Sequence, residues 1–204
     1  MFHEIVAAET VEVPMENRQT VEEDSNNAVE VDGVRLEILV PERTWVIPEN
    51  KPSSETPVQL GFRLTNLRQE AIRFSLINPL LVIIDSDGKR LRVSGGRDIL
   101  LRSPLVCRLL SPGESLTFFP DIQLSWNENK LYLAGLDGVG GGWLYEGLEA
   151  KKYKIKWIYD SNIVLGLCRD IENIKPETSR REIQRKFWLN FIQTPWIEIN
   201  LAQP

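Results

Sequence analysis

The segment that decides the fold reads Tyr153-Lys154-Ile155-Lys156-Trp157-Ile158-Tyr159. Its apolar and polar residues alternate with a period of two, which gives a β-strand one buried face and one exposed face. Residues 58–66 repeat this alternation. We therefore expect an all-β protein in which Trp157, on the apolar side of its strand, lies in the core.

Turn signals separate a series of further expected strands. These strands lie at residues 34–40, 58–65, 72–76, 80–84, 90–93, 105–110, 116–126 with a break at Pro120, 187–190 and 196–201. The segments 85–88 and 111–114 are short and polar and each contain a glycine, which is typical of tight turns. Their spacing of about 8 to 12 residues indicates an antiparallel β-sandwich. Strands do not alternate with amphipathic helices, which argues against a parallel α/β fold.

The acidic charge of the chain is concentrated at its N-terminus. Residues 1–32 hold nine acids and one base, Arg18, so this segment carries a charge of −8 while residues 33–204 carry +3. It lacks sustained periodicity and cannot offset its own ordering entropy by apolar burial. We expect a disordered acidic tail over residues 1–32, a β-sandwich domain over residues 33–204, and nearly unchanged stability when the tail is removed.

The sequence favours a soluble cytoplasmic protein with free thiols. The first residues lack a basic region and a continuous apolar run, so they do not resemble a secretory signal. The longest wholly apolar stretch, residues 80–84, is too short to span a membrane. In a reducing compartment Cys107 and Cys168 are expected to be unpaired, with a single disulfide as the alternative.

Several short segments resemble bacterial immunoglobulin-like or fibronectin-III-like sandwich domains. They are Leu64-Thr65-Asn66, Asp85-Ser86-Asp87-Gly88-Lys89, Leu110-Ser111-Pro112-Gly113-Glu114-Ser115, Tyr153-Lys154-Ile155, and the stretch from Trp188 to Ile199. The resemblance covers roughly residues 34–201 and implies an immunoglobulin-like fold without any catalytic residue. Residues 162–186 form a longer insert than such domains usually have. Its apolar spacing predicts a short helix.

Most familiar catalytic chemistry is not expected, because His3 is the only histidine and lies in the acidic tail. Ser-His-Asp and Cys-His arrangements need a positioned imidazole, and catalytic zinc usually needs two or three. The segment 85–88 fails as an EF-hand, since Ile83 and Ser94 would occupy carboxylate positions. The glycine-rich stretch 135–142 lacks the Gly-Lys-Ser/Thr of a phosphate-binding loop. We expect no enzyme activity, cofactor or metal.

Two groups of residues are candidates for binding a partner. Tyr132, Trp143 and Tyr145 flank the glycines of an expected loop at residues 127–149 and are suited to anchor a partner; the alternative is that they pack as core. The second group is basic and comprises Arg180, Arg181, Arg185 and Lys186. This group would form the rim of the same site, remain as a solvated loop, or receive the acidic tail. A charge of +3 on the body does not indicate a nucleic-acid-binding protein.

The tryptophans complete the expected core. Trp157, Trp188 and Trp196 fall in expected strands and are predicted to be buried, whereas Trp45 and Trp126 lie near strand ends and are ambiguous.

The sequence therefore favours a non-enzymatic interaction or scaffolding module that binds a protein through the loops at 127–149 and 162–186, the tail, or an edge strand. One alternative is an enzyme inhibitor or regulator that inserts a loop into a cleft. These two functions would be distinguished by whether truncation of a loop abolishes binding while proline substitutions in an edge strand do not. A carbohydrate-acting enzyme with a carboxylate pair is a third class that the sequence leaves open.

Overall fold

The computed structural model describes residues 25–51, 53–75, 79–94, 107–136, 142–160, 188 and 190–204. The expected helix at 162–186, the basic group from Arg180 to Lys186, His3 and Cys168 lie outside these residues. In the part of the chain that the structure describes, no helix has the length and apolar character of a membrane span.

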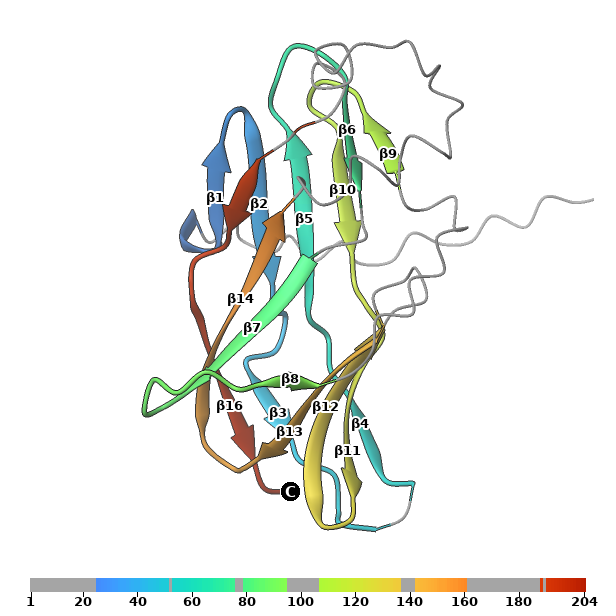
Figure 1. Ribbon diagram of the computed structural model, residues 1–204, viewed down its shortest axis with the longest axis vertical. Helices are drawn as coiled ribbons and strands as arrows, with labels where there is room; N and C mark the ends of the chain where they lie inside the picture. Colours follow the sequence, from blue (N-terminus) through green and yellow to red (C-terminus); the bar gives the residue numbers. More distant parts are fainter. Residues whose placement is uncertain are drawn as a thin grey trace, which may run out of the picture.

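The protein is an all-β sandwich of antiparallel sheets, as the alternating sequence predicted (Figure 1). Its strands are β1 (Ala28–Val31), β2 (Val34–Leu39), β3 (Thr44–Val46), β4 (Glu55–Pro57), β5 (Gly61–Asn66), β6 (Ile72–Ser75), β7 (Pro79–Asp85), β8 (Val93–Ser94), β9 (Cys107–Leu110), β10 (Ser115–Phe118), β11 (Ile122–Asn127), β12 (Lys130–Leu136), β13 (Gly142–Leu148), β14 (Lys152–Asp160), β15 (Phe191–Gln193) and β16 (Ile197–Ala202). A single 3₁₀ turn, Ser25–Asn27, precedes β1.

The first sheet, sheet A, has the strand order β1-β2-β5-β10. Its first hairpin turns at Asp32 and Gly33, whose φ angles of 48° and 71° match the twist of the flanking strands. Strand β2 then pairs with β5 in a register that sets Leu36 opposite Leu64. Alternate residues of β2 and β5 are buried, so one face of sheet A closes onto the core.

The second sheet, sheet B, is built around β14. This strand pairs with β7 along one edge and with β15 and β16 along the other, and β16 continues to β3 in the one parallel pairing of the sheet.

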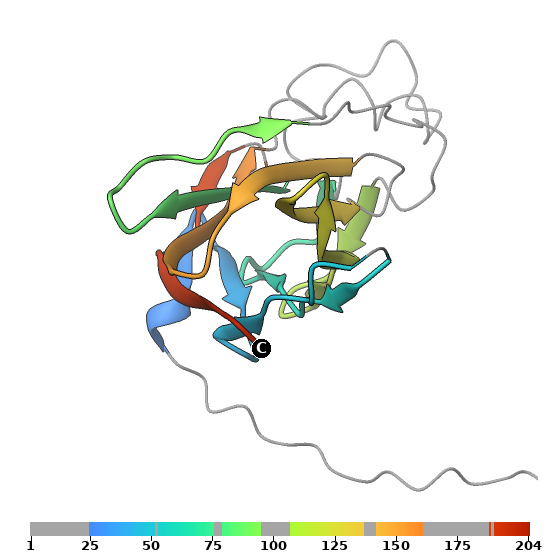
Figure 2. The same ribbon diagram turned by 90° about the horizontal axis from the view of Figure 1, so that it is seen from below.

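A third sheet, sheet C, has the order β4-β11-β12-β13-β8, and β6 pairs with β9. Seen from below, the strands surround a common interior, with β14 (orange) and β7 (green) across one side and β4 (cyan) across the opposite side (Figure 2).

The core joins the sheets through large aromatic side chains. Trp157 of β14 is 1% exposed, and its ring meets Phe62 of β5 edge to face at 5.7 Å. Its indole N–H donates to the carbonyl oxygen of Gly61 at 2.9 Å, so a buried polar atom is satisfied across the sandwich. Tyr145 of sheet C donates its hydroxyl to the carbonyl of Leu81 in β7. The core position predicted for Trp157 is confirmed.

Three sequence expectations are corrected. Residues 28–31, assigned to the disordered tail, form β1, because Asp32 and Gly33 supply the hairpin turn that lets this segment pair with β2. Most of the expected loop at 127–149 is strand, namely β12 and β13 joined in a ladder. Trp196 is 39% exposed and not in the core. Trp188 is buried as expected, and Trp45, whose position the sequence left ambiguous, is buried as well.

Trp157→Ala should lower the free energy of unfolding by about 3 to 5 kcal/mol, because it empties a large buried site and leaves the Gly61 carbonyl without its donor. Trp196→Ala removes the same atoms from an exposed site and should cost less than about 1 kcal/mol. Denaturant titration of both variants makes the comparison. A loss below about 1 kcal/mol for Trp157→Ala would contradict the assignment of this face to the core.

Deletion of residues 1–32 should destabilise the protein by about 2 kcal/mol relative to deletion of residues 1–24. Only the longer deletion removes β1, whose Val29 and Val31 are half-buried against the core. Thermal and denaturant unfolding of the two deletion variants isolate the contribution of this strand. Equal stability in the two variants would restore the original expectation that the fold begins at Gly33.

Candidate functional site

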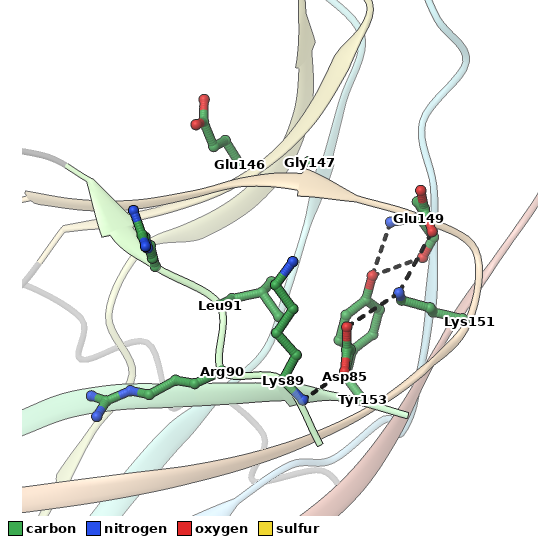
Figure 3. Close-up of a pocket in the computed structure, with 10 residues that line it drawn as sticks. Asp85, Lys89, Arg90, Leu91, Glu146, Gly147, Glu149, Lys151 and Tyr153 are labelled. Atoms are coloured by element: carbon green, nitrogen blue, oxygen red, sulfur yellow. Dashed lines mark hydrogen bonds and ion pairs between the residues drawn. The ribbon is translucent and has the colours of Figure 1, made fainter. Parts of the chain in front are cut away.

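A cavity of about 400 Å³ lies between the connection from β7 to β8 and the turn from β13 to β14 (Figure 3). Its lining combines charged side chains of both signs with one tyrosine and one leucine. The lining residues are Asp85, Lys89, Arg90, Leu91, Arg92, Glu146, Gly147, Glu149, Lys151 and Tyr153. The size is that of a site for a small molecule or a short peptide side chain.

Asp85 organises one wall of the cavity. Its Oδ1 accepts the backbone N–H groups of Asp87 and Lys89 at 3.0 and 2.9 Å, which closes the turn that the sequence predicted at residues 85–88. Its Oδ2 lies 3.5 Å from Nζ of Lys151. The hydrogen bond from Lys89 is the largest influence on the pKa of Asp85, and together with Asp87 and Lys151 it lowers that pKa against the opposing effect of burial.

Lys151 is held on several sides at once. Besides Asp85, it contacts Glu149 at 3.5 Å and lies 5.6 Å from the centre of the Tyr153 ring. Partial burial acts to lower the pKa of Lys151, but the charges of Tyr153, Asp85 and Glu149 outweigh it and raise the pKa. The Tyr153 hydroxyl accepts the backbone N–H of Glu149 at 2.9 Å, which fixes the turn between β13 and β14. The turn and the hairpin are thereby tied into one rigid rim.

The charges that remain around the cavity are mostly positive. Glu146 has a cation partner, Lys130, at 3.7 Å. By contrast, Lys89, Arg90 and Arg92 are exposed, and within the described ranges no carboxylate pairs with their side chains. Each acid of the lining is therefore engaged, while three of its cations are available to a ligand or partner.

A second polar surface adjoins this rim on the outer face of sheet B. We define this outer face by Val82, Ile84, Arg90, Lys154, Lys156 and Trp196, whose strand positions place them opposite the core. Lys156 Nζ lies 4.4 Å from the centre of the Trp196 ring and donates to Oε1 of Gln193 at 2.7 Å. Val82 is 3% exposed although it lies outside the core cluster. The face therefore has an apolar floor and a cationic, aromatic rim.

Two cations on this face lie close enough to interact. Burial lowers the pKa of Lys156, and the positive charge of Arg90 lowers it further. Arg90 is placed there by its bridge to Ile84 across the hairpin. Like charges held near one another attract an anionic group, because such a group relieves their mutual repulsion.

The aromatic residues predicted as anchors lie in strands of sheet C. Tyr145 is 2% exposed and belongs to the core, as the alternative interpretation had it; burial raises its pKa to about 12, with Arg90 acting in the opposite direction. Trp143 is half-buried and packs at 5.8 Å against Tyr145. A Cβ at Gly135 would lie 2.1 Å from the Trp143 ring, so a glycine is needed there. Partner contact by Tyr132 and Trp143, both half-buried, stays a prediction.

The described part of the chain offers no cluster of three or more metal-ligating side chains. At the cavity, Lys151 lies between Asp85 and Glu149, at 3.5 Å from a carboxylate oxygen of each.

The sequence analysis placed Trp196 in the core, although the alternation of the residues that follow it indicated an exposed position. In β16 the residues 197, 199 and 201 are buried, so 196 and 198 share the opposite face by strand parity. The assignment to the core followed the general burial of tryptophan instead.

Comparisons with protein-family models, with curated proteins and with solved structures found no match.

Asp85→Asn should destabilise the protein at pH 7, and the difference from wild type should disappear as the pH falls below about 3. Since folding lowers the pKa of Asp85, the ionised carboxylate contributes stability above its unfolded pKa near 3.8, and wild type loses it as the pH falls through the lower folded value. Asparagine keeps the turn acceptor but not the charge.

Urea titrations at pH 7 and pH 3 measure this difference. Lys151→Met should act in the same direction at pH 7, and the double variant should lose less than the sum of the two single changes. A difference that is as large at pH 3 as at pH 7 would contradict the ionic role of Asp85.

Proposed function

We propose that this protein is a non-enzymatic interaction module, an immunoglobulin-like β-sandwich that binds an acidic segment of a protein partner on the outer face of sheet B. The observation that carries the proposal is the exposure of Trp196 beside a cation at 4.4 Å. Tryptophan and arginine are enriched among residues that dominate binding energy. An exposed tryptophan on a rigid sheet loses little conformational entropy when a partner covers it.

The apolar floor supports the same role. Val82 is already nearly inaccessible, and Ile84 is half-buried, so the centre of the face is largely dehydrated before a partner arrives. A partner side chain packed against Trp196 would extend this apolar area at small additional desolvation cost. The surrounding lysines and Arg90 would then form the polar rim that protein interfaces usually have.

The charges on the outer face of sheet B determine which kind of partner it would attract. Arg90, Lys154 and Lys156 are positive, and Glu198, which faces Lys154 across the strands, is hydrogen-bonded to Lys152 at 2.8 Å. That bond is the main reason that the pKa of Glu198 is lowered. With this acid engaged, an incoming carboxylate or phosphorylated side chain is attracted to the face, and a basic segment is repelled.

The test begins by identifying a partner from host cells and then measures its affinity for variants of the full chain. Trp196→Ala should weaken binding by at least about 2 kcal/mol because it removes the aromatic anchor. Phe119→Ala, which truncates another exposed aromatic residue, is the matched control and should change the affinity by less than about 0.5 kcal/mol.

Charge reversal provides the second arm of this test. Lys154→Glu should slow association and reduce its salt dependence, whereas Arg108→Glu on the exposed part of β9 should not. Wild-type affinity in Trp196→Ala and Lys154→Glu, with circular dichroism unchanged, would refute binding at this face. Loss of affinity only in variants of Tyr132 or Trp143 would move the site to sheet C.

A further inference from the structure

The side of sheet B that carries Trp196 exposes further apolar surface at both ends of the sheet. Phe191 of β15 and Val46 of β3 each stand next to a residue that points into the core, so by strand parity both lie on the outside with Trp196. They are 47% and 46% exposed, and with Trp196 they make up three of the seven large apolar side chains exposed in the described part of the chain. Apolar surface gathered on one sheet face is typical of a contact with another segment.

The charges on this side of sheet B sum to a positive value. Among the described residues four cations and two carboxylates point outward, a net charge of +2: Arg90, Lys152, Lys154, Lys156, Asp160 and Glu198.

Three of these cations form one cluster. Lys154, Ile84 and Arg90 lie in one row across three adjacent strands, since Ile84 is opposite both of the others. Lys156 stands one position further along the same side of β14, with its Nζ 4.4 Å from the centre of the Trp196 ring. Cationic and apolar groups are thus interspersed on this face.

The charge on the face disfavours a second copy of the same face as its occupant, because the cations of the two chains would meet. A complementary composition lies in the chain itself. Residues 1–24, which we call segment 1–24, contain seven acids and one base, so with His3 neutral their charge is −6. Three of the acids lie within residues 9–16, together with Val11, Val13 and Met15.

The described chain begins close to sheet B. The 3₁₀ turn Ser25–Asn27 leads into β1, and β1 lies beside β15, the short red arrow next to it in Figure 1. The Asn190 side chain donates to Oδ2 of Asp32, which ties the hairpin of β1 to the residues just before β15. An extended segment of 24 residues spans up to about 80 Å, so every part of the face is within its reach.

We propose that segment 1–24 occupies the outer face of sheet B in the free protein and that an acidic partner has to displace it. The proposal rests on the function proposed above, since it gives the same face an acidic occupant from within the chain. Carboxylates of the segment would pair with the cluster of Arg90, Lys154 and Lys156, and its apolar residues would cover Trp196.

The direct connection to β1 makes even a weak contact effective. A tethered segment has an effective concentration on the order of 1 mM at a nearby site. If segment 1–24 binds with a Kd of about 0.1 mM as a separate peptide, it would occupy the face in roughly nine molecules out of ten. A competing acidic ligand would then bind about tenfold more weakly to the intact chain.

The test compares the wild-type full chain with a neutral-tail full chain, in which glutamine or asparagine replaces the seven acids of segment 1–24. The probe is a synthetic peptide with the sequence of residues 1–24, and its binding is followed at low ionic strength through the indole N–H signal of Trp196 by NMR. We expect saturable binding of one equivalent to the neutral-tail chain, about tenfold tighter than to wild type, whose own segment competes.

Further variants of the neutral-tail chain locate the bound peptide. Trp196→Ala and Lys154→Gln should each weaken peptide binding by at least about fivefold, because each removes part of the contact. Phe119→Ala and Arg108→Gln are the matched controls, since they remove an exposed aromatic group and a cation away from sheet B. Each control should change the affinity by less than about twofold.

Three results would overturn the proposal. Equal peptide affinity in the wild-type and neutral-tail chains would mean that segment 1–24 does not occupy the face. Equal weakening in the control variants would mean that the peptide responds only to the overall charge and apolar surface of the protein. A Trp196 signal in wild type that shifts with protein concentration would assign the occupant to segment 1–24 of a second copy. Since the partner affinities of Trp196→Ala and Lys154→Glu are measured separately, failure here is distinguishable from failure of the proposed function.

Discussion

The buried contact between Trp157 and the Gly61–Phe62 segment is the constraint on which the rest of the structure depends. It joins sheet B to sheet A by edge-to-face packing and by an indole hydrogen bond to a backbone carbonyl. The backbone N–H of Trp157 is in turn satisfied by the hydroxyl of buried Thr194. A Cβ at Gly61 would lie 2.5 Å from the carbonyl oxygen of Phe118, so β5 can approach β10 only with glycine there. In a low-dielectric interior, each of these groups is costly to leave unpaired, which fixes how the sheets meet.

Because Trp157 fixes one face of β14 in the core, it also fixes the other face outside. The buried residues of this strand alternate with Lys152, Lys154 and Lys156, so a single strand supplies both core and cationic surface. Strand β7 carries apolar residues on both faces, and Val82 is buried although it lies outside the core cluster. The outer face of sheet B is therefore a direct consequence of the packing inside.

The same strand also carries the cavity. Tyr153 begins the buried series of β14 and closes the preceding turn through Glu149, while its partner in register, Asp85, ends β7 and starts the hairpin. The ends of two paired strands thus place a carboxylate and a phenol side by side, and Lys151 bridges them. The ion pairs that hold the two turns together therefore also form a wall of the cavity.

The sequence by itself determined the all-β class, the inward face of β14 and the turns at 85–88 and 111–114, because strand period and turn chemistry are local properties. It did not determine that residues 28–31 pair as β1, since a short edge strand is decided by its neighbour. The core position of Tyr145 likewise depends on the Leu81 carbonyl, which lies 64 residues away. Only the tertiary structure brought Lys89, Arg92 and Lys151 to one cavity and Lys156 to Trp196, because those contacts join strands whose register no local pattern records.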